Sequence, residues 1–186
     1  MAFPVFASGD VLNASDMNAV GLWLITEVDI AAAATTNINN CFSSSYRNYL
    51  ITSNLTTSAN TGISVRLRAS GSDNSTSNYN LGYRYGSITG VNNGDQQAGS
   101  QAQWNFHQSN LNRVMNMNLM LFDPQTANNT TGSFNNFVAD NSTTSYFWFV
   151  GACSFNATTQ FDGFSIYTGG APTISGRIRV YGMRNT

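Results

Sequence analysis

The C-terminal part of the chain alternates with a period of two. From position 174 to 181 the sequence reads Ile-Ser-Gly-Arg-Ile-Arg-Val-Tyr. Successive side chains of a β-strand point to opposite faces, so Ile178 and Val180 share one face and Arg177 and Arg179 share the other. The pattern predicts a half-buried strand whose arginine face is solvated or meets a partner.

A second strand precedes it and carries Phe164 and Ile166 at alternate positions. Residues 169–172 between the two strands read Gly-Gly-Ala-Pro, a composition typical of turns. These features predict a hairpin that closes an antiparallel sheet.

The middle of the chain predicts further strands. Four apolar residues alternate strictly with other positions and indicate an inner strand: Met115, Met117, Leu119 and Leu121. Residues 146–155 are apolar on both faces, which favours a central strand or an interface. Residues 89–101 are polar and glycine-rich and predict a loop. Eight or more short strands separated by turn signals predict an all-β fold, a jelly-roll-like antiparallel β-sandwich over residues 30–186.

Residues 1–29 have a different pattern and predict a separate N-terminal arm. Residues 14–24 predict a short helix with Asn13 or Ser15 as its N-cap. The arm either packs on its own domain or docks on another protein or a neighbouring copy, and we favour docking. The expected docking residues are Phe3, Phe6, Met17, Trp23 and Leu24.

Composition narrows the choice of partners. Only 9% of the 186 residues are charged, against about 25% in ordinary soluble domains, and the net charge is −1. We therefore expect no nucleic-acid partner held by phosphate contacts. No apolar stretch is long enough to span a membrane, and no signal peptide is expected. Cys41 and Cys153 lack metal-type spacing and predict buried free thiols.

Catalytic chemistry is not indicated. His107 is the single histidine, and no serine lies in a nucleophile-elbow motif. Asp140 and Asp162 are candidates for a carboxylate pair, but Asp162 stands in Phe-Asp-Gly-Phe, where forming a turn is the favoured role. We expect no enzymatic activity, no metal and no cofactor.

A saccharide site is the binding function that these residue types suit. Aromatic rings stack on sugar faces, and amides hydrogen bond to hydroxyl groups. The candidates beside the polar segment 89–101 are Tyr83, Tyr85, Trp104 and His107. The alternative, which we favour for each residue taken singly, is an ordinary core position.

Three segments resemble a known group of proteins. They are Gly176-Arg-Ile-Arg-Val-Tyr-Gly-Met-Arg184 after Phe161-Asp-Gly-Phe164, the opening Gly9-Asp-Val-Leu-Asn-Ala-Ser-Asp-Met-Asn18, and Tyr46-Arg-Asn-Tyr-Leu50 followed by Val65-Arg-Leu-Arg-Ala-Ser-Gly-Ser-Asp-Asn74. The chain thereby resembles small virion structural proteins of tailed bacteriophages, especially marine and cyanobacterial phages, which are described as tail-fibre or appendage proteins.

The resemblance implies a non-enzymatic virion structural protein, a tail-fibre, spike or appendage component involved in host adsorption. Its expected partners are other virion proteins of the tail, fibre or capsid, further copies of itself in a homotrimer, and a host surface glycan. Such a protein sits on the virion and assembles in the reducing host cytoplasm, which disfavours a disulfide. The alternative is a capsid decoration or cement protein that stabilises the phage head. A free lectin-like or hydrolytic domain is a third, less favoured interpretation.

Overall fold

The computed structural model describes residues 21–59, 61–88, 93–109, 114–139 and 146–184. These residues form strands and connecting segments, with no helix among them. Their bounds are β1 Leu22–Ala33, β2 Thr35–Ile38, β3 Tyr46–Thr57, β4 Thr61–Ala69, β5 Ser72–Asp73, β6 Tyr79–Ser87, β7 Asn93–Gln101, β8 Trp104–Ser109, β9 Val114–Phe122, β10 Thr130–Ala139, β11 Tyr146–Phe155, β12 Gly163–Thr168 and β13 Ile174–Arg184. The predicted all-β class is confirmed.

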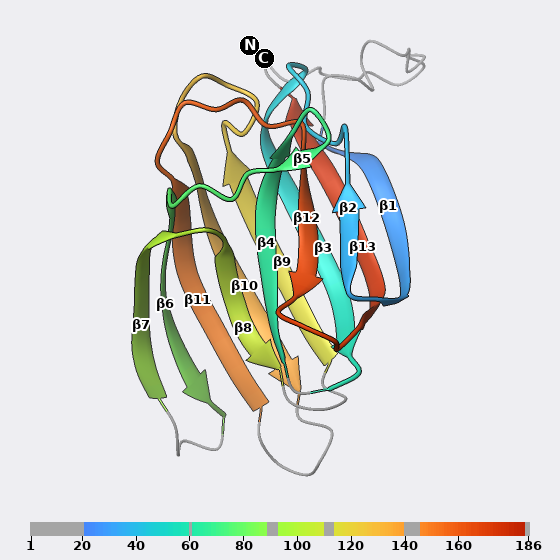
Figure 1. Cartoon of the computed structure of the whole chain (residues 1–186), viewed down its shortest axis with the longest axis vertical. Helices are drawn as coiled ribbons and strands as arrows, with labels where there is room; N and C mark the ends of the chain where they lie inside the picture. Colours follow the sequence, from blue (N-terminus) through green and yellow to red (C-terminus); the bar gives the residue numbers. More distant parts are fainter. Residues whose placement is uncertain (1–20, 60, 89–92, 110–113, 140–145, 185–186) are drawn as a thin grey trace, which may run out of the picture.

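The strands form two antiparallel sheets. The large sheet has eight strands in the order β1-β13-β3-β9-β10-β11-β6-β7. The small sheet has the order β2-β12-β4-β5, and β8 pairs with β4 beside β5. In the view of Figure 1, the small sheet lies in front of the large one and leaves β6 and β7 at one side.

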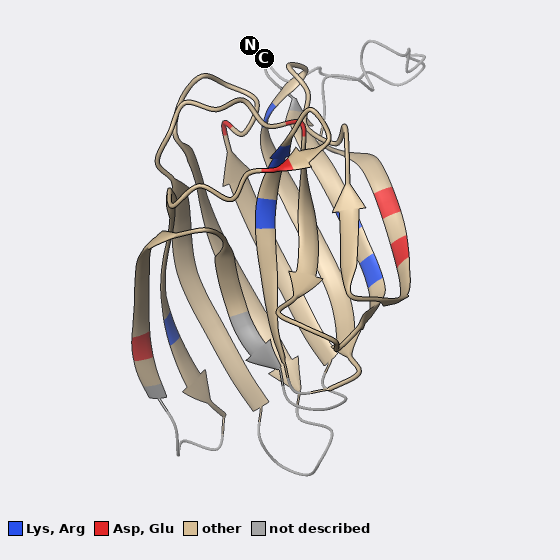
Figure 2. Ribbon diagram, viewed as in Figure 1, with Lys and Arg blue, Asp and Glu red and all other residues tan. Residues whose placement is uncertain are grey.

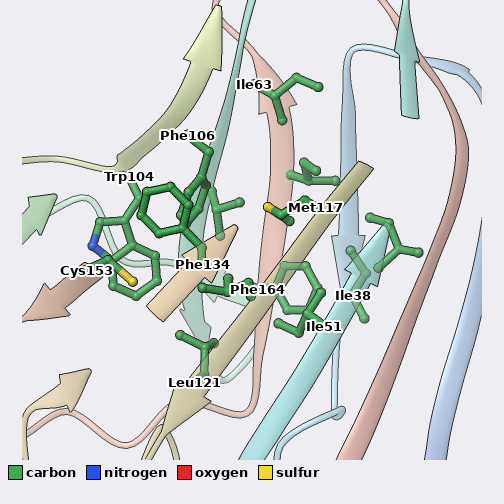
Figure 3. Packing of buried hydrophobic residues seen from close by; sticks show 14 of the residues in the cluster. Ile38, Ile51, Ile63, Trp104, Phe106, Met117, Leu121, Phe134, Cys153 and Phe164 are labelled. Carbon is green, nitrogen blue, oxygen red and sulfur yellow. The ribbon is translucent and has the colours of Figure 1, made fainter. Parts of the chain in front are cut away.

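The core lies between the two sheets. Figure 3 shows residues of both sheets packed together, with Phe164, Ile38 and Ile63 from the small sheet and Met117, Phe134 and Ile51 from the large one. The alternating residues of β9 are fully buried, as their pattern predicts: Met115, Met117, Leu119 and Leu121. Both cysteines are buried and free, which confirms that prediction.

The predicted helix over 14–24 is wrong where the structure describes it, since Leu22–Ala33 is strand β1. Residues 14–20, with most of that helix, lie outside the described residues. Gly21 has φ +101°, which is incompatible with a helix interior. β1 contains the β-branched residues Thr26, Val28 and Ile30, and it pairs with β13 over its length. The strand crosses the expected boundary between residues 29 and 30.

The predicted hairpin of the last two strands is also wrong. β12 pairs with β2 and β4 in the small sheet, whereas β13 pairs with β1 and β3 in the large sheet. The link between them crosses from one sheet to the other and is held at the end of β3. There, Ser58 N donates to Thr173 O, and Thr173 N donates to Ser58 Oγ, both at 2.9 Å.

Part of the predicted loop 89–101 is the edge strand β7. It pairs with β6 through its backbone, with Tyr83 opposite Gln96 and Arg84 opposite Asp95. An edge strand that is largely solvated needs no apolar alternation, so its polar sequence concealed it. Residues 89–92 lie outside the described part of the chain.

Candidate functional site

The four expected saccharide contacts have different surroundings. Trp104 is fully buried, and its Nε1 donates to Ser154 O at 3.1 Å. Its ring packs edge-on against Tyr79, with centroids 5.2 Å apart. Trp104 is therefore a core residue whose ring is not available to a ligand. His107 pairs with Ile63 through the backbone of β8, and its side chain lies outside what the structure describes.

Tyr83 and Tyr85 are half-buried on the inner face of β6. Tyr85 stacks on Phe149 with centroids 5.8 Å apart, and Tyr83 meets the same ring edge-on at 5.7 Å. Burial, and to a smaller degree Tyr85, raises the pKa of Tyr83, so its hydroxyl remains a neutral donor and acceptor at physiological pH. The two rings therefore have restricted positions, and part of each remains accessible.

Tyr83 lines a small groove of about 90 Å³ where β6 and β7 extend past the edge of the small sheet. We call it the amide groove because amide side chains make up most of its wall. Its lining residues are Leu81, Tyr83, Gln96, Gln97, Ala98, Gln101, Gln103 and Asn105. None of the described lining side chains carries a charge, so the groove offers hydrogen-bond donors and acceptors to a neutral, hydroxyl-rich ligand.

Gln103 is the most constrained part of this wall. Its Nε2 donates to Asn105 Oδ1 at 2.8 Å and to Ser64 Oγ at 3.2 Å. Its Oε1 accepts from Arg66 Nη2 at 3.0 Å and from the Tyr167 hydroxyl. These bonds use both N–H groups and both carbonyl lone pairs of the amide, so Gln103 holds this wall of the groove in place instead of bonding a ligand directly.

Arg66 and Tyr167 support Gln103 from outside the groove. The Arg66 guanidinium lies 4.9 Å from the centroid of the Tyr167 ring, and its Nε donates to Ala102 O at 3.1 Å. Burial raises the pKa of Tyr167 to about 12, although Arg66 opposes this shift. The phenol therefore keeps the proton that it donates to Gln103.

The expected docking residues fall into two groups. Phe3, Phe6 and Met17 lie outside the described residues. Trp23 and Leu24 are consecutive residues of β1 and thus point to opposite faces of the large sheet. Leu24 is 54% exposed and Leu22 is 48% exposed. On the outer face they stand opposite Tyr181 and Met183 of β13, so this corner of the sheet is apolar.

Farther along the same outer face, charged residues are paired. Arg177 makes two bonds to the Asp29 carboxylate, at 2.5 and 3.0 Å, and Arg179 bonds Glu27. The Arg177 hydrogen bond holds the pKa of Asp29 below its usual range. The predicted strand face with Arg177 and Arg179 is thus an outer face whose arginines are matched by the carboxylates of β1. Figure 2 shows these charges on the neighbouring strands β1 and β13.

On the strands nearer the centre of the sheet, the outer face carries paired amide side chains. Asn54 donates to Asn116 at 2.6 Å across β3 and β9, and Asn118 donates to Asn135 at 2.9 Å across β9 and β10. The side chains satisfy one another along the surface. The outer face is therefore polar without a net charge in this region.

Exposed apolar side chains occupy β10 and β11 on the same face. We call them the aromatic patch, which comprises Phe137 (36% exposed), Tyr146 (42%), Trp148 (37%) and Val150 (55%). The Phe137 and Tyr146 rings stack with centroids 5.9 Å apart and an interplanar angle of 15°. Residues 146–155 were predicted to be apolar on both faces, and the structure shows that one of these faces meets solvent.

The described residues contain no group of three or more histidine, cysteine, aspartate or glutamate side chains that could hold a metal ion. Asp162 joins remote segments of the chain: its Oδ2 accepts from Ser70 N at 2.8 Å, its N–H donates to Arg68 O, and its carbonyl accepts from Phe42 N. Asp140 lies outside the described residues. In the part of the chain that the structure describes, no helix has the length and apolarity needed to cross a bilayer.

Comparison with known proteins gives no relative. No family model, no curated protein and no solved structure matches the chain.

Proposed function

We propose that this chain is a non-enzymatic structural protein of a tailed-bacteriophage virion, a tail-fibre, spike or appendage component that takes part in host adsorption. The three phage-like sequence segments support the virion assignment. The amide groove supports a binding role over a catalytic one, because none of the described side chains that line it is a carboxylate, histidine, thiol or guanidinium.

The proposal includes a jelly-roll β-sandwich as the fold. Eight strands support it through their distribution between the sheets: β1, β3, β9 and β13 belong to the large sheet, and β2, β4, β8 and β12 to the small one. Their orders, β1-β13-β3-β9 and β2-β12-β4-β8, are those of two interleaved Greek keys. The strands β6, β7, β10 and β11 then extend the large sheet beyond this unit.

The observation that carries the proposal is the placement of β1 and β7 at opposite edges of the large sheet. The apolar corner of β1, with Leu22 and Leu24, lies at one edge, and the amide groove lies at the other. Seven strand intervals of about 4.8 Å separate the two edges by about 34 Å. A subunit attached through the β1 edge can therefore present the groove away from its attachment.

The test is a cryo-EM map of the whole particle. We expect Phe3, Phe6, Met17, Trp23 and Leu24 to contact tail or fibre proteins, and the amide groove to face outward. If the map instead shows many copies of this chain on the capsid lattice, the adsorption function is wrong and the protein is a capsid decoration protein. An arm that packs only on its own subunit would remove the docking role.

The glycan part of the proposal has its own test with purified protein. Binding to a panel of neutral host-surface oligosaccharides should weaken at least about tenfold for Gln103→Ala, since Gln103 holds one wall of the groove in place through four hydrogen bonds. Gln160→Ala, in the segment between β11 and β12 and outside the groove, serves as the matched control. Equal binding by both variants, or none by the wild type, would exclude a saccharide site here.

A further inference from the structure

The aromatic patch has no cover within the described chain. It includes two large rings and a β-branched side chain from one strand, Tyr146, Trp148 and Val150, all exposed on the outer face of β11. The residue of β6 opposite Trp148 is Gly86, which has no side chain to shield the indole. Ile88, 62% exposed, lies next to Tyr146 and donates its backbone N–H to Tyr146 O at 2.9 Å. Contiguous exposed apolar surface of this kind marks an interaction site.

The patch lies on inner strands of the sheet, toward the end where β10 finishes and β11 begins. β10 and β11 are the fifth and sixth of the eight strands. Aromatic residues dominate the binding energy of many protein interfaces, and Trp148 and Tyr146 lie on a strand away from both edges of the sheet. An interface that covers the outer face would therefore have its strongest contacts here.

The charges of the face favour an identical partner. Of the described residues, three carboxylates and three guanidiniums belong to it, and they pair with one another: Glu27, Asp29 and Asp95 with Arg84, Arg177 and Arg179. When two copies meet through the same face, a net charge on that face repels itself. The net charge of these six side chains is zero, so this repulsion is absent. The amide pairs Asn54–Asn116 and Asn118–Asn135 likewise need no charged partner.

The outer face also has a recess beside the aromatic patch. A shallow hollow of about 380 Å³ is lined on β6, β7 and β11 by small or short residues, among them Asn80, Gly82, Ala152 and Ser154. It lies on the same strands as Val150 and Arg84, one row away. A projecting patch and a recess on one face allow each copy to contribute both to its neighbours.

The outer face is large enough for a stable protein–protein interface. Seven intervals of about 4.8 Å between the eight strands, and strands of about nine residues at about 3.3 Å per residue, give a face of about 34 by 30 Å, or about 1,000 Å². A stable interface covers about 800 Å² on each partner. The face can supply that area without help from the rest of the molecule.

We infer that the outer face of the large sheet is the interface between copies of this chain, with its strongest contacts at the aromatic patch. The inference rests on the proposed virion function and on the homo-oligomer that the sequence resemblance implies, and it assigns self-association to the folded domain instead of the N-terminal arm. The partner that fits is a second copy presenting the same face, which has no net charge.

Sedimentation of the full-length protein tests the inference. Two variants remove the strongest contacts of the interface while retaining strand-forming or exposed positions, namely Trp148→Thr and Val150→Glu. A control, Thr35→Glu, introduces the same charge at an exposed position of the small sheet. We expect an oligomeric wild type, a dissociation constant raised at least about tenfold in both patch variants, and no change in the control.

The outcomes separate the inference from the proposed function. A wild type that stays monomeric at all concentrations overturns both the interface and the homo-oligomer. An oligomeric wild type whose patch variants associate as tightly overturns the interface alone. If Trp148→Thr fails to fold, Val150→Glu decides, because Val150 is the most exposed residue of the patch.

Discussion

At the scale of single residues, Arg68 is the charged side chain whose loss should matter most for folding. It is 6% exposed, and its guanidinium donates to Asn37 and Asn39 at 3.0 and 2.9 Å, to Asp73 and to Gly71 O. We expect Arg68→Met to lower the free energy of unfolding by about 2–3 kcal/mol, since it leaves these acceptors without a donor and Asp73 only partly solvated.

The matched control for Arg68 is Arg47→Met. Arg47 bonds Asp123 at 2.7 Å, but its side chain is 56% exposed, and exposed ion pairs contribute less than about 1 kcal/mol. Urea unfolding at one fixed protein concentration measures both. Equal losses in the two variants would contradict the structural role assigned to Arg68.

The buried thiols give a pH dependence. Burial raises the pKa of Cys41 to about 12 and raises that of Cys153 as well, whereas an unfolded thiol ionises near 8.5. As pH rises, the thiols of the unfolded chain lose their protons before those of the folded chain. The thiols therefore leave the free energy of unfolding unchanged below about pH 8.5 and lower it as pH rises from there toward 12. We expect a loss of about 1.4 kcal/mol per pH unit for each thiol above pH 9.

Urea unfolding of the wild type and of Cys41→Ala between pH 7 and 10 checks this expectation, because the tyrosines are the same in both proteins. Cys41→Ala should be less stable at pH 7 but should lose stability more slowly with rising pH. If the free energy of unfolding of Cys41→Ala fell with pH as steeply as that of the wild type, the ionisation of Cys41 would not differ between the folded and unfolded chains.

Sequence reasoning reached only part of the binding groove. Alternation placed Tyr83 and Tyr85 on one face of a strand, as the structure has them, but it could not show that Trp104 faces the core. Gln103 was missed because its role depends on Arg66 and Tyr167, 37 and 64 positions away. No local pattern reports such a meeting of distant strands.

At the scale of the elements, alternation identified most strands but not their partners. The predicted strands of Phe164 and Ile178 are present, yet they belong to different sheets. Each strand has the same apolar pattern whether its neighbour is the next strand in sequence or a remote one. Pairing depends on backbone links such as those between Ser58 and Thr173, which the sequence does not reveal.

Gly176 provides a test of one such pairing. It lies in β13 with φ +134°, and a Cβ at this position would stand 2.1 Å from Asn54 O on β3. Gly176→Ala should therefore lower the free energy of unfolding by at least about 2 kcal/mol, through both backbone strain and the clash.

Gly82→Ala in β6 is the control for Gly176. A Cβ there meets nothing within 4 Å, and its φ is not in the left-handed region. Alanine should be neutral or stabilise the strand by about 0.5–1 kcal/mol. Chemical unfolding compares the two variants, and a tolerated Gly176→Ala would mean that β3 and β13 are not so closely paired.

At the scale of the whole molecule, the outer face of the large sheet is better suited to bind another copy of the chain than its two edges are. The edge strands β1 and β7 carry the carboxylates Glu27, Asp29 and Asp95, and charged edges disfavour strand addition by another chain. The outer face has no such protection near Trp148. Copies should therefore meet face to face instead of extending the sheet.

Association of this kind links thermal stability to protein concentration. Because folded chains alone associate, a hundredfold rise in concentration should stabilise each chain of a face-to-face dimer by about 1.4 kcal/mol, which raises Tm by about 3–6 °C in a protein of this size. Val150→Glu should show a weaker dependence and should melt below the wild type at the highest concentration. Scanning calorimetry over that range measures both proteins. A wild-type Tm independent of concentration, or a variant that follows the wild type, would mean that the aromatic patch does not hold the copies together.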